Sequence, residues 1–359
     1  MSVMLEPDPR DRGIELDPRD RGGPAQPLLH VEHLKKYFPI YGGLLNRTVA
    51  TVQAVDDVSF SVRKGETLGI VGESGCGKST TARLLMRLVP PDAGDIVFDG
   101  EVVGAPHGIS VNEMRRQMQM VFQDSYSSFN PRMTIVESIA YAPRMHGLGG
   151  KAALDRAEGL LTQVGLNPGQ YARRYPHELS GGQRQRINIA RALALEPRLV
   201  ILDEAVAALD KSVEAQVLNL LTELKARFNL TYLFISHDLN VVEYMSDRVM
   251  VMYLGRVVET GPVEEIYRHP RHPYTRALFA SKPTLDPDRR TTEMPLTGDP
   301  PNPINPPSGC RFRTRCAFAQ GVCAEMAPAL VAPLDGEFDA ALPHLVACHL
   351  PEAQRGAHA

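Results

Sequence analysis

Hydrophobic and polar positions alternate in the manner of half-buried strands from Leu28 onward, first in LLHVEHL and then in VQAVDDVSFSV. Three short apolar runs follow, at Thr67–Val71, Leu199–Asp203 and residues 231–236, and a helical pattern comes after each of them. Uniformly apolar runs are typical of parallel strands that are buried on both faces. Strands that alternate with helices in this way predict an α/β core.

Two further patterns add detail to that core. The segment RVMVMYLGRVVETG predicts a β-hairpin that turns near Leu254 and Gly255. Between about residues 131 and 194 the apolar positions recur with helical spacing instead. We therefore expect a helical subdomain, at about residues 124–194, inserted into an α/β domain that covers residues 28–281.

The composition changes at both ends of the chain. Residues 1–27 are rich in Pro, Gly, Asp and Arg and contain the hexapeptide DPRDRG twice. This segment has few apolar side chains to offset its ordering entropy, so we expect it to be disordered. Prolines gather in GDPPNPINPPSG after about Ser281, and four of the five cysteines follow. Residues 282–359 are therefore expected to form a small C-terminal appendage.

Charge and hydropathy narrow the possible functions. The net charge of −3 argues against a general nucleic-acid-binding protein, which usually carries a basic excess. No apolar stretch approaches the roughly 18 residues needed to span a bilayer. The N-terminus lacks the basic start and apolar run of a secretory signal. These features predict a cytoplasmic location.

A phosphate-binding loop is predicted between the first apolar run and the helix that follows it. The segment GESGCGKS fits the pattern G-x-x-x-x-G-K-[ST] at every fixed position, in the strand–turn–helix context that this motif requires. Glycines let backbone N–H groups converge on a phosphate, a lysine reaches the β- and γ-phosphates, and a serine ligates Mg²⁺. Cys76 occupies a variable position and is expected to be a spectator. The expected nucleotide-binding residues of this loop are Gly72, Glu73, Ser74, Gly75, Cys76, Gly77, Lys78, Ser79 and Thr80.

Two acidic residues end the second apolar run. Asp203 closes the strand and is expected to hold Mg²⁺. Glu204 is the next residue, so its side chain is redirected by the pleat of the strand. There it is expected to act as the general base for an attacking water.

A third motif narrows the choice among proteins that carry these two. The segment LSGGQ, at residues 179–183, resembles the signature of ATP-binding cassette (ABC) proteins. Ser180 is typical of a helix N-cap, and Gly181, Gly182 and Gln183 follow it, which predicts a second phosphate-facing helix start. The resemblance covers residues 28–281. It implies a P-loop NTPase core of ABC type with an antiparallel β subdomain and the helical insertion.

Four other positions match the family in order along the chain. Gln123 in VFQD resembles the glutamine that contacts Mg²⁺, and Asp210 resembles an aspartate at the dimer interface. His237 in ISHD resembles the histidine that contacts the γ-phosphate. Tyr37 resembles the aromatic residue that stacks on adenine, although Phe38 and Tyr41 compete for that role.

The resemblance also implies a mechanism and partners. Two cassettes pair head to tail, and each ATP lies between the phosphate loop of one and the LSGGQ segment of the other. Hydrolysis at Glu204, assisted by Lys78 and His237, moves attached membrane subunits. The implied partners are two membrane-spanning permease subunits, a second ATPase subunit, which is either a different chain or a copy of this one, and, indirectly, an extracytoplasmic solute-binding protein. The chain is accordingly expected at the cytoplasmic face of the cell membrane.

The C-terminal part resembles one branch of the family. HPYTRALFAS, at residues 272–281, and the cysteine tail are similar to those of oligopeptide and dipeptide importers. In some members of that branch such a tail holds an iron–sulfur cluster. Four thiolates suit a [4Fe–4S] cluster or Zn²⁺, and free thiols without metal are the third alternative. The expected ligands are Cys310, Cys316, Cys323 and Cys348.

Some residues depart from the pattern of this branch. Ala205 replaces a proline after the glutamate, Ala207 replaces a serine, and Lys211 replaces a small apolar residue. These changes keep a non-hydrolysing regulatory cassette as one alternative. A soluble cassette ATPase that acts on nucleic acid or ribosomes is a second, and an importer of another solute, such as nickel, is a third. The pattern as a whole favours an ATPase that powers peptide import.

Overall fold

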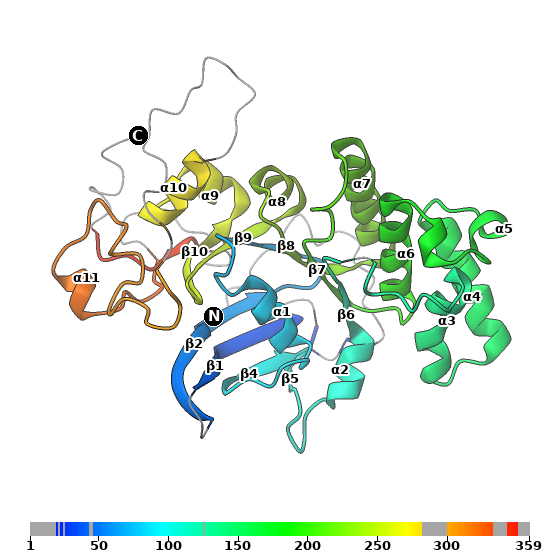
Figure 1. Ribbon diagram of the computed structural model, residues 1–359, viewed down its shortest axis with the longest axis horizontal. Helices are drawn as coiled ribbons and strands as arrows, with labels where there is room; N and C mark the ends of the chain where they lie inside the picture. Colours follow the sequence, from blue (N-terminus) through cyan, green and yellow to red (C-terminus); the bar gives the residue numbers. More distant parts are fainter. Residues whose placement is uncertain are drawn as a thin grey trace, which may run out of the picture.

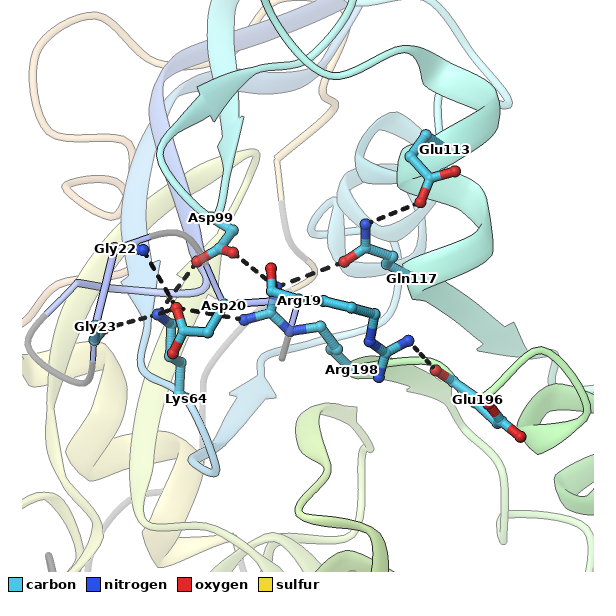
Figure 2. A network of polar contacts seen from close by, with 10 residues as sticks. All are labelled: Arg19, Asp20, Gly22, Gly23, Lys64, Asp99, Glu113, Gln117, Glu196 and Arg198. Atoms are coloured by element: carbon cyan, nitrogen blue, oxygen red, sulfur yellow. Dashed lines mark hydrogen bonds and ion pairs between the residues drawn. The ribbon is translucent and has the colours of Figure 1, made fainter. Parts of the chain in front are cut away.

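The computed structural model describes residues 19–20, 22–23, 26–42, 46–124, 126–281, 299, 301–332 and 343–350. The first copy of DPRDRG lies outside the described residues. Of the second copy, Arg19, Asp20 and Gly22 are described, and they lie against the folded domain (Figure 2).

An antiparallel sheet is built from the first alternating segments, in the order β2-β1-β4-β5. Alternate side chains of its strands are buried, as the sequence pattern predicted. Its strands are β1 (Leu29–Gly42), β2 (Arg47–Val62), β4 (Ala93–Phe98) and β5 (Glu101–Val102).

The second sheet has the order β11-β10-β9-β3-β8-β7-β6. Five neighbouring strands, from β9 to β6, run parallel, and β10 and β11 extend one edge antiparallel. The strands are β3 (Thr67–Val71), β6 (Met118–Val121), β7 (Leu199–Asp203), β8 (Thr231–Ile235), β9 (Arg248–Tyr253), β10 (Arg256–Pro262) and β11 (Leu345–Val346). The predicted hairpin is confirmed, with Leu254 and Gly255 at positive φ between β9 and β10.

Each face of the parallel strands packs against a different layer. Leu68 and Ile201 belong to the apolar cluster shared with α1 (Lys78–Leu85) and the antiparallel sheet. Leu202 and Phe234 belong to the cluster on the other face. That face is covered by α6 (Gly181–Leu193), α7 (Lys211–Phe228), α8 (Leu239–Met245) and α9 (Val263–Arg268) (Figure 1). Burial on both faces explains why these strands are uniformly apolar.

The predicted helical region lies to one side of the parallel sheet, beyond β6 and β7 (Figure 1). It contains α3 (Ile135–Met145), α4 (Gly150–Gln163), α5 (Pro168–Tyr171), a 3₁₀ turn (Pro176–Glu178) and α6. A separate short helix, α2 (Val111–Gln117), precedes β6. Within the part of the chain that the structure describes, no helix has both the length and the apolar character needed to cross a membrane.

The C-terminal residues return to the main sheet. Helix α10 (Pro273–Ala280) follows β10 and α9, and α11 (Val322–Glu325) lies among loops that carry the cysteines. Strand β11 then pairs with β10, with Val346 opposite Glu259. The buried Glu259 carboxylate accepts backbone N–H groups of Arg271 and His272 and contacts His344. The last described strand is thus joined to the cassette by both backbone and side chains.

A buried ionic network joins the two sheets at the end of β7 opposite to Asp203 (Figure 2). Arg198, just before β7, pairs with Asp99 of the β4–β5 turn at 2.7 Å. Lys64 contacts the other oxygen of Asp99 at 3.2 Å, and it also pairs with Asp20. Arg19 donates to the carbonyl oxygen of Glu196 at 2.8 Å.

Candidate active site

The phosphate loop lies between β3 and α1 and wraps around its own lysine. The Lys78 ammonium donates to the carbonyl oxygens of Gly72 at 2.6 Å and Glu73 at 3.0 Å. Gly77 caps α1 with a φ of 108°, and a Cβ added there would lie 2.3 Å from the carbonyl oxygen of Ala54. Only glycine fits that position, and it leaves the helix N-terminus without a side-chain cap. An open helix start beside a lysine suits an anion.

Ser79 and Asp203 meet beside this loop. The Ser79 hydroxyl donates to Asp203 Oδ1 at 3.0 Å, although 124 residues separate them. Burial, followed by the neighbouring Glu204, raises the pKa of Asp203, despite the hydrogen bond from Ser79 that lowers it. A hydroxyl and a carboxylate are oxygen ligands of the kind that Mg²⁺ takes, and a nearby cation would favour the ionised aspartate. This pair of donors therefore fits Mg²⁺.

Three predicted residues come together one position beyond Asp203. The Gln123 amide donates to Glu204 Oε2 at 2.6 Å, and His237 Nδ1 lies 3.6 Å from the same oxygen. Glu204 has a φ of 48°, a left-handed conformation that is costly for this residue, and its N–H donates to Ile235 of β8. The turn after β7 thus aims the Glu204 side chain at the segments that follow β6 and β8.

Tyr37 is held by a carboxylate on the neighbouring strand. Its hydroxyl donates to Asp56 Oδ1. Burial, together with Asp56, raises the pKa of Tyr37 to about 12. Although burial alone would raise it, the pKa of Asp56 is lowered by hydrogen bonds from Tyr37 and Arg256 and by the charge of Arg311. Phe38 and Tyr41 are more exposed, and Phe38 lies under the Lys36 ammonium.

The LSGGQ segment forms a second helix start, as predicted from the capping pattern. Ser180 caps α6, where it accepts the N–H of Gln183 at 3.3 Å, and Gln183 Oε1 accepts the N–H of Ser180 at 3.0 Å. A Cβ at Gly182 would lie 2.4 Å from Val213 of α7, so glycine allows close packing of the two helices. Asp210 is the N-cap residue of α7.

This second helix start is not brought to the phosphate loop of the same chain. Helix α1 lies on the side of the antiparallel sheet, whereas α6 lies on the side of the helical region (Figure 1). The structure therefore separates Ser180, Gly181, Gly182 and Gln183 from the loop, while it brings Lys78, Ser79, Asp203, Gln123, Glu204 and His237 to one edge of the sheet.

The four C-terminal cysteines lie near one another in the structure. Burial, followed by the proximity of Cys348 and Cys323, raises the pKa of Cys310. Burial and the same neighbours raise the pKa of Cys316 to about 11. Across the described residues, however, no three Cys, His, Asp or Glu side chains are placed as ligands of one ion. The structure does not support the expected iron–sulfur or zinc site.

Several contacts to the predicted site were missed by sequence reasoning. Arg315 donates through both terminal nitrogens to Glu73 of the phosphate loop. Arg311 contacts Asp56, the residue that holds Tyr37, and the hydroxyl of Tyr274 accepts the N–H of Glu73. The contacts of the two arginines span more than 240 residues of sequence, so no local pattern could have indicated them.

Comparison with known proteins shows which families and relatives this chain resembles. Residues 55–207 match the family described as ABC transporter, and residues 258–323 match the family described as oligopeptide/dipeptide transporter, C-terminal region. A probable peptide ABC transporter ATP-binding protein of Sinorhizobium fredii is 49% identical over 332 residues, covering 92% of each chain. An oligopeptide transport ATP-binding protein of Bacillus subtilis is 50% identical over 328 residues, covering 90% of this chain and 97% of the relative.

A solved structure shares the fold. CbiO1 of Clostridium perfringens, described as part of the ABC transporter complex CbiONQ, aligns with a TM-score of 0.58 and 26% identity. The alignment covers 68% of this chain and 91% of CbiO1. Together with relatives that are about half identical over nearly their whole length, this likeness shows that the chain belongs to the family of ABC transporter ATP-binding proteins.

Proposed function

We propose that this chain binds ATP and Mg²⁺ at the phosphate loop and hydrolyses ATP to drive the import of peptides. The observation that carries the proposal is the meeting of Gln123, Glu204 and His237 next to the Ser79–Asp203 pair. Two relatives that share about half of the sequence are named as peptide or oligopeptide transport ATP-binding proteins, which supports the choice of cargo.

Each residue of the proposed site has its own role in ATP binding or hydrolysis. Lys78 binds the terminal phosphates, and Ser79 and Asp203 hold Mg²⁺, which neutralises charge that develops on the phosphate oxygens. Glu204 accepts a proton from the attacking water, because its carboxylate lies beside the loop and, among the described residues, is paired with no lysine or arginine. His237, with a side chain 63% exposed, is free to turn towards the γ-phosphate. Tyr37 provides a ring for adenine.

The separation of α1 from α6 supports a paired assembly. We propose that Ser180, Gly181, Gly182 and Gln183 complete the phosphate site of a second cassette, with Asp210 at the shared interface. The pair would bind two membrane-spanning permease subunits at the cytoplasmic face of the cell membrane, and a solute-binding protein would deliver the peptide from outside. The oxygen and amide groups at the start of α6 supply the hydrogen bonds that such an interface requires.

A substitution at the proposed base tests the function. Glu204→Gln keeps the size and the contact to Gln123 but cannot accept a proton. We expect ATP binding to be retained, ATP turnover to fall by at least about 10²-fold, and uptake of a labelled oligopeptide by cells to be lost. ATP binding, phosphate release and uptake are measured on the same variants.

Glu158→Gln is the matched control, because Glu158 lies on the exposed face of α4 in the helical region. It should behave as the unchanged chain in all three measurements. Unchanged turnover in Glu204→Gln would defeat the assignment of the base. Lost turnover with normal peptide uptake would instead defeat the proposed cargo.

We also retain a metal-binding role for the cysteines as a proposal. It is supported by the mutual proximity of Cys310, Cys316, Cys323 and Cys348, since neighbouring cysteines add to the larger effect of burial on the pKa of Cys310 and Cys316. The test is to assay iron, acid-labile sulfide and zinc in the full chain purified without oxygen. Iron and sulfide in equal amounts would support a cluster, zinc alone would support a zinc site, and the lack of all three would end the proposal.

A further inference from the structure

A short segment between two of the cysteines lies against the phosphate loop. Residues 311–315, here called the arginine segment, begin directly after Cys310 and end directly before Cys316. Arg311 and Arg315 are buried in spite of their charge, with side chains 6% and 5% exposed. Buried guanidinium groups need acceptors, and each of these two arginines has a carboxylate of the cassette among its acceptors, Asp56 for Arg311 and Glu73 for Arg315.

Arg315 forms a two-pronged ion pair with the phosphate loop. Its Nη1 donates to Glu73 Oε2 at 2.7 Å, and its Nη2 donates to Glu73 Oε1 at 3.1 Å. The hydrogen bonds that Arg315 donates to Glu73 raise the pKa of Arg315 further above its ordinary value. Bidentate pairs of this type fix both distance and orientation, and they are stronger than pairs of neutral groups.

The backbone of Glu73 is held as well. Its N–H donates to the hydroxyl of Tyr274 at 2.8 Å, and its carbonyl oxygen accepts the Lys78 ammonium at 3.0 Å. Glu73 therefore contacts Lys78, the residue that would bind phosphate. It also contacts Tyr274 and Arg315, which belong to the C-terminal part of the chain. Movement of Glu73 would shift the loop around Lys78.

The rest of the arginine segment fixes Arg315 in place. Phe312 is buried, with its ring centroid 5.3 Å from that of Tyr253 and 5.5 Å from that of Tyr274. Arg311 donates to the carbonyl oxygen of Leu254 and to Asp56. Phe312 thus holds the segment against Tyr253, and Arg311 holds it at Leu254 and Asp56. The guanidinium of Arg315 therefore has little freedom to leave Glu73.

The negative charge of Glu73 is the reason why its contact with Arg315 matters for nucleotide binding. Glu73 places a carboxylate in a loop whose proposed ligand carries several negative charges, and like charges in a partly buried site repel. Arg315 neutralises the charge of Glu73. It also holds the Glu73 side chain towards the C-terminal region and away from the proposed ligand of the loop. We propose that Arg315 is a positioning residue for ATP, which it favours by pairing with Glu73; this inference rests on the proposed ATPase function.

The test is a double-mutant cycle on the full chain, with the affinity for ATP and Mg²⁺ measured by calorimetry at low ionic strength. Arg315→Gln is expected to weaken ATP binding about tenfold, since it leaves a charge-assisted pair broken. The rate at saturating ATP should stay the same, so the change appears in KM and not in kcat. In the Glu73→Gln background the same substitution at Arg315 should have no further effect on ATP affinity.

Two further variants separate positioning from a merely structural role. Arg313→Gln is the matched control, because the hydrogen bonds of Arg313 stay within the C-terminal region, at Ser308. It should bind ATP as the unchanged chain does. Arg315→Lys keeps the positive charge but lacks the two parallel N–H donors of the guanidinium. It should restore most of the ATP affinity that Arg315→Gln loses. If Arg315→Gln does not fold, the ATP affinity of Glu73→Gln is compared instead with that of the unchanged chain and that of Arg315→Lys.

Several outcomes would overturn the inference. One is ATP binding by Arg315→Gln that equals that of the unchanged chain. Another is a loss of the same size in the Glu73→Gln background, which would mean that Arg315 acts by a route other than Glu73. If the unchanged chain itself binds no ATP, the proposed function fails with the inference. If it binds and hydrolyses ATP while Arg315→Gln is normal, only the inference fails.

Discussion

Two adjacent carboxylates at the end of β7 lie in different surroundings. Asp203 is 4% exposed and accepts the Ser79 hydroxyl, and burial raises its pKa. Glu204 leaves the strand at a positive φ and accepts the Gln123 amide near His237. One carboxylate is thus suited to a cation, and the other to a proton from water. A single strand end provides both groups because the backbone changes conformation between them.

Replacing Asp203 should have opposite effects on Mg²⁺-dependent ATP turnover and on the stability of the metal-free chain. Because folding raises the pKa of Asp203, this group favours the folded state at low pH, and that contribution is lost as the pH rises through the folded pKa. At neutral pH and without metal, the ionised carboxylate therefore destabilises the fold. Asp203→Asn removes this cost and should make the chelator-treated chain harder to unfold at neutral pH, while Mg²⁺-dependent ATP turnover is lost.

Denaturant unfolding with chelator present, repeated as the pH is lowered, checks this prediction. The advantage of Asp203→Asn should shrink as the pH falls through the pKa of Asp203 in the folded chain, since the unchanged chain then carries a neutral carboxyl as well. A variant that is less stable than the unchanged chain at neutral pH would contradict the expected cost of the buried charge.

Lys211, which the sequence marked as unusual, has a local role in the structure. Its side chain is 77% exposed and pairs with Asp238 at 2.8 Å and with Glu214 at 3.0 Å. These pairs raise the pKa of Lys211. Asp238 caps α8 and directly follows His237. Lys211 therefore links the start of α7, next to Asp210, to the turn that carries His237, the residue proposed to contact the γ-phosphate.

At the scale of whole elements, the two sheets are joined by the buried pair of Arg198 and Asp99 (Figure 2). Asp99 has a φ of 49°, which asparagine tolerates as well as aspartate does. Asp99→Asn therefore tests the charge and leaves the turn intact. We expect it to lower the free energy of unfolding by about 3 kcal/mol, because Arg198 stays buried with a weaker partner.

Asp95→Asn on β4, the strand that precedes this turn, is the control, since Asp95 is exposed. Chemical denaturation of both variants gives the comparison, and the control should unfold with nearly the free energy of the unchanged chain. Equal losses in the two variants would mean that the pair does little to hold the sheets together.

Sequence patterns predicted the elements that are uniform over several residues. Strands β3, β7 and β8 have their predicted residues almost unchanged, because burial on both faces demands an unbroken apolar run. The cap of α6 was also predicted, since serine at an N-cap is a local requirement. Ser79 and Asp203 were each expected to hold Mg²⁺, and the structure brings them together.

What the patterns could not predict depends on residues far apart in the sequence. The C-terminal region has little regular structure, and its contacts are made by single side chains such as Arg311, Phe312 and Arg315. Their partners lie on β2, β9 and in the phosphate loop, and nothing in the spacing of the segment encodes that. The resemblance to a branch with metal-binding tails led instead to a ligand set that the described residues do not form.

At the scale of the whole molecule, the proposed nucleotide site draws residues from every layer. The antiparallel sheet contributes Tyr37, the parallel strands contribute Asp203 and Glu204, and the segment before the helical region contributes Gln123. The C-terminal region adds Arg315. Each layer that moves can therefore be sensed at the phosphate loop, which is what a coupling between hydrolysis and transport requires.

The pairing of Arg315 with Glu73, and of Arg311 with Asp56, has a consequence for protein engineering. If this C-terminal tail were grafted onto another cassette, that cassette would have to present matching acids, or else the two arginines would be buried as unpaired positive charges. Chimeras that exchange tails should therefore function only when the acceptors are exchanged along with them. Tail and cassette would then have to diversify together, as one inherited unit.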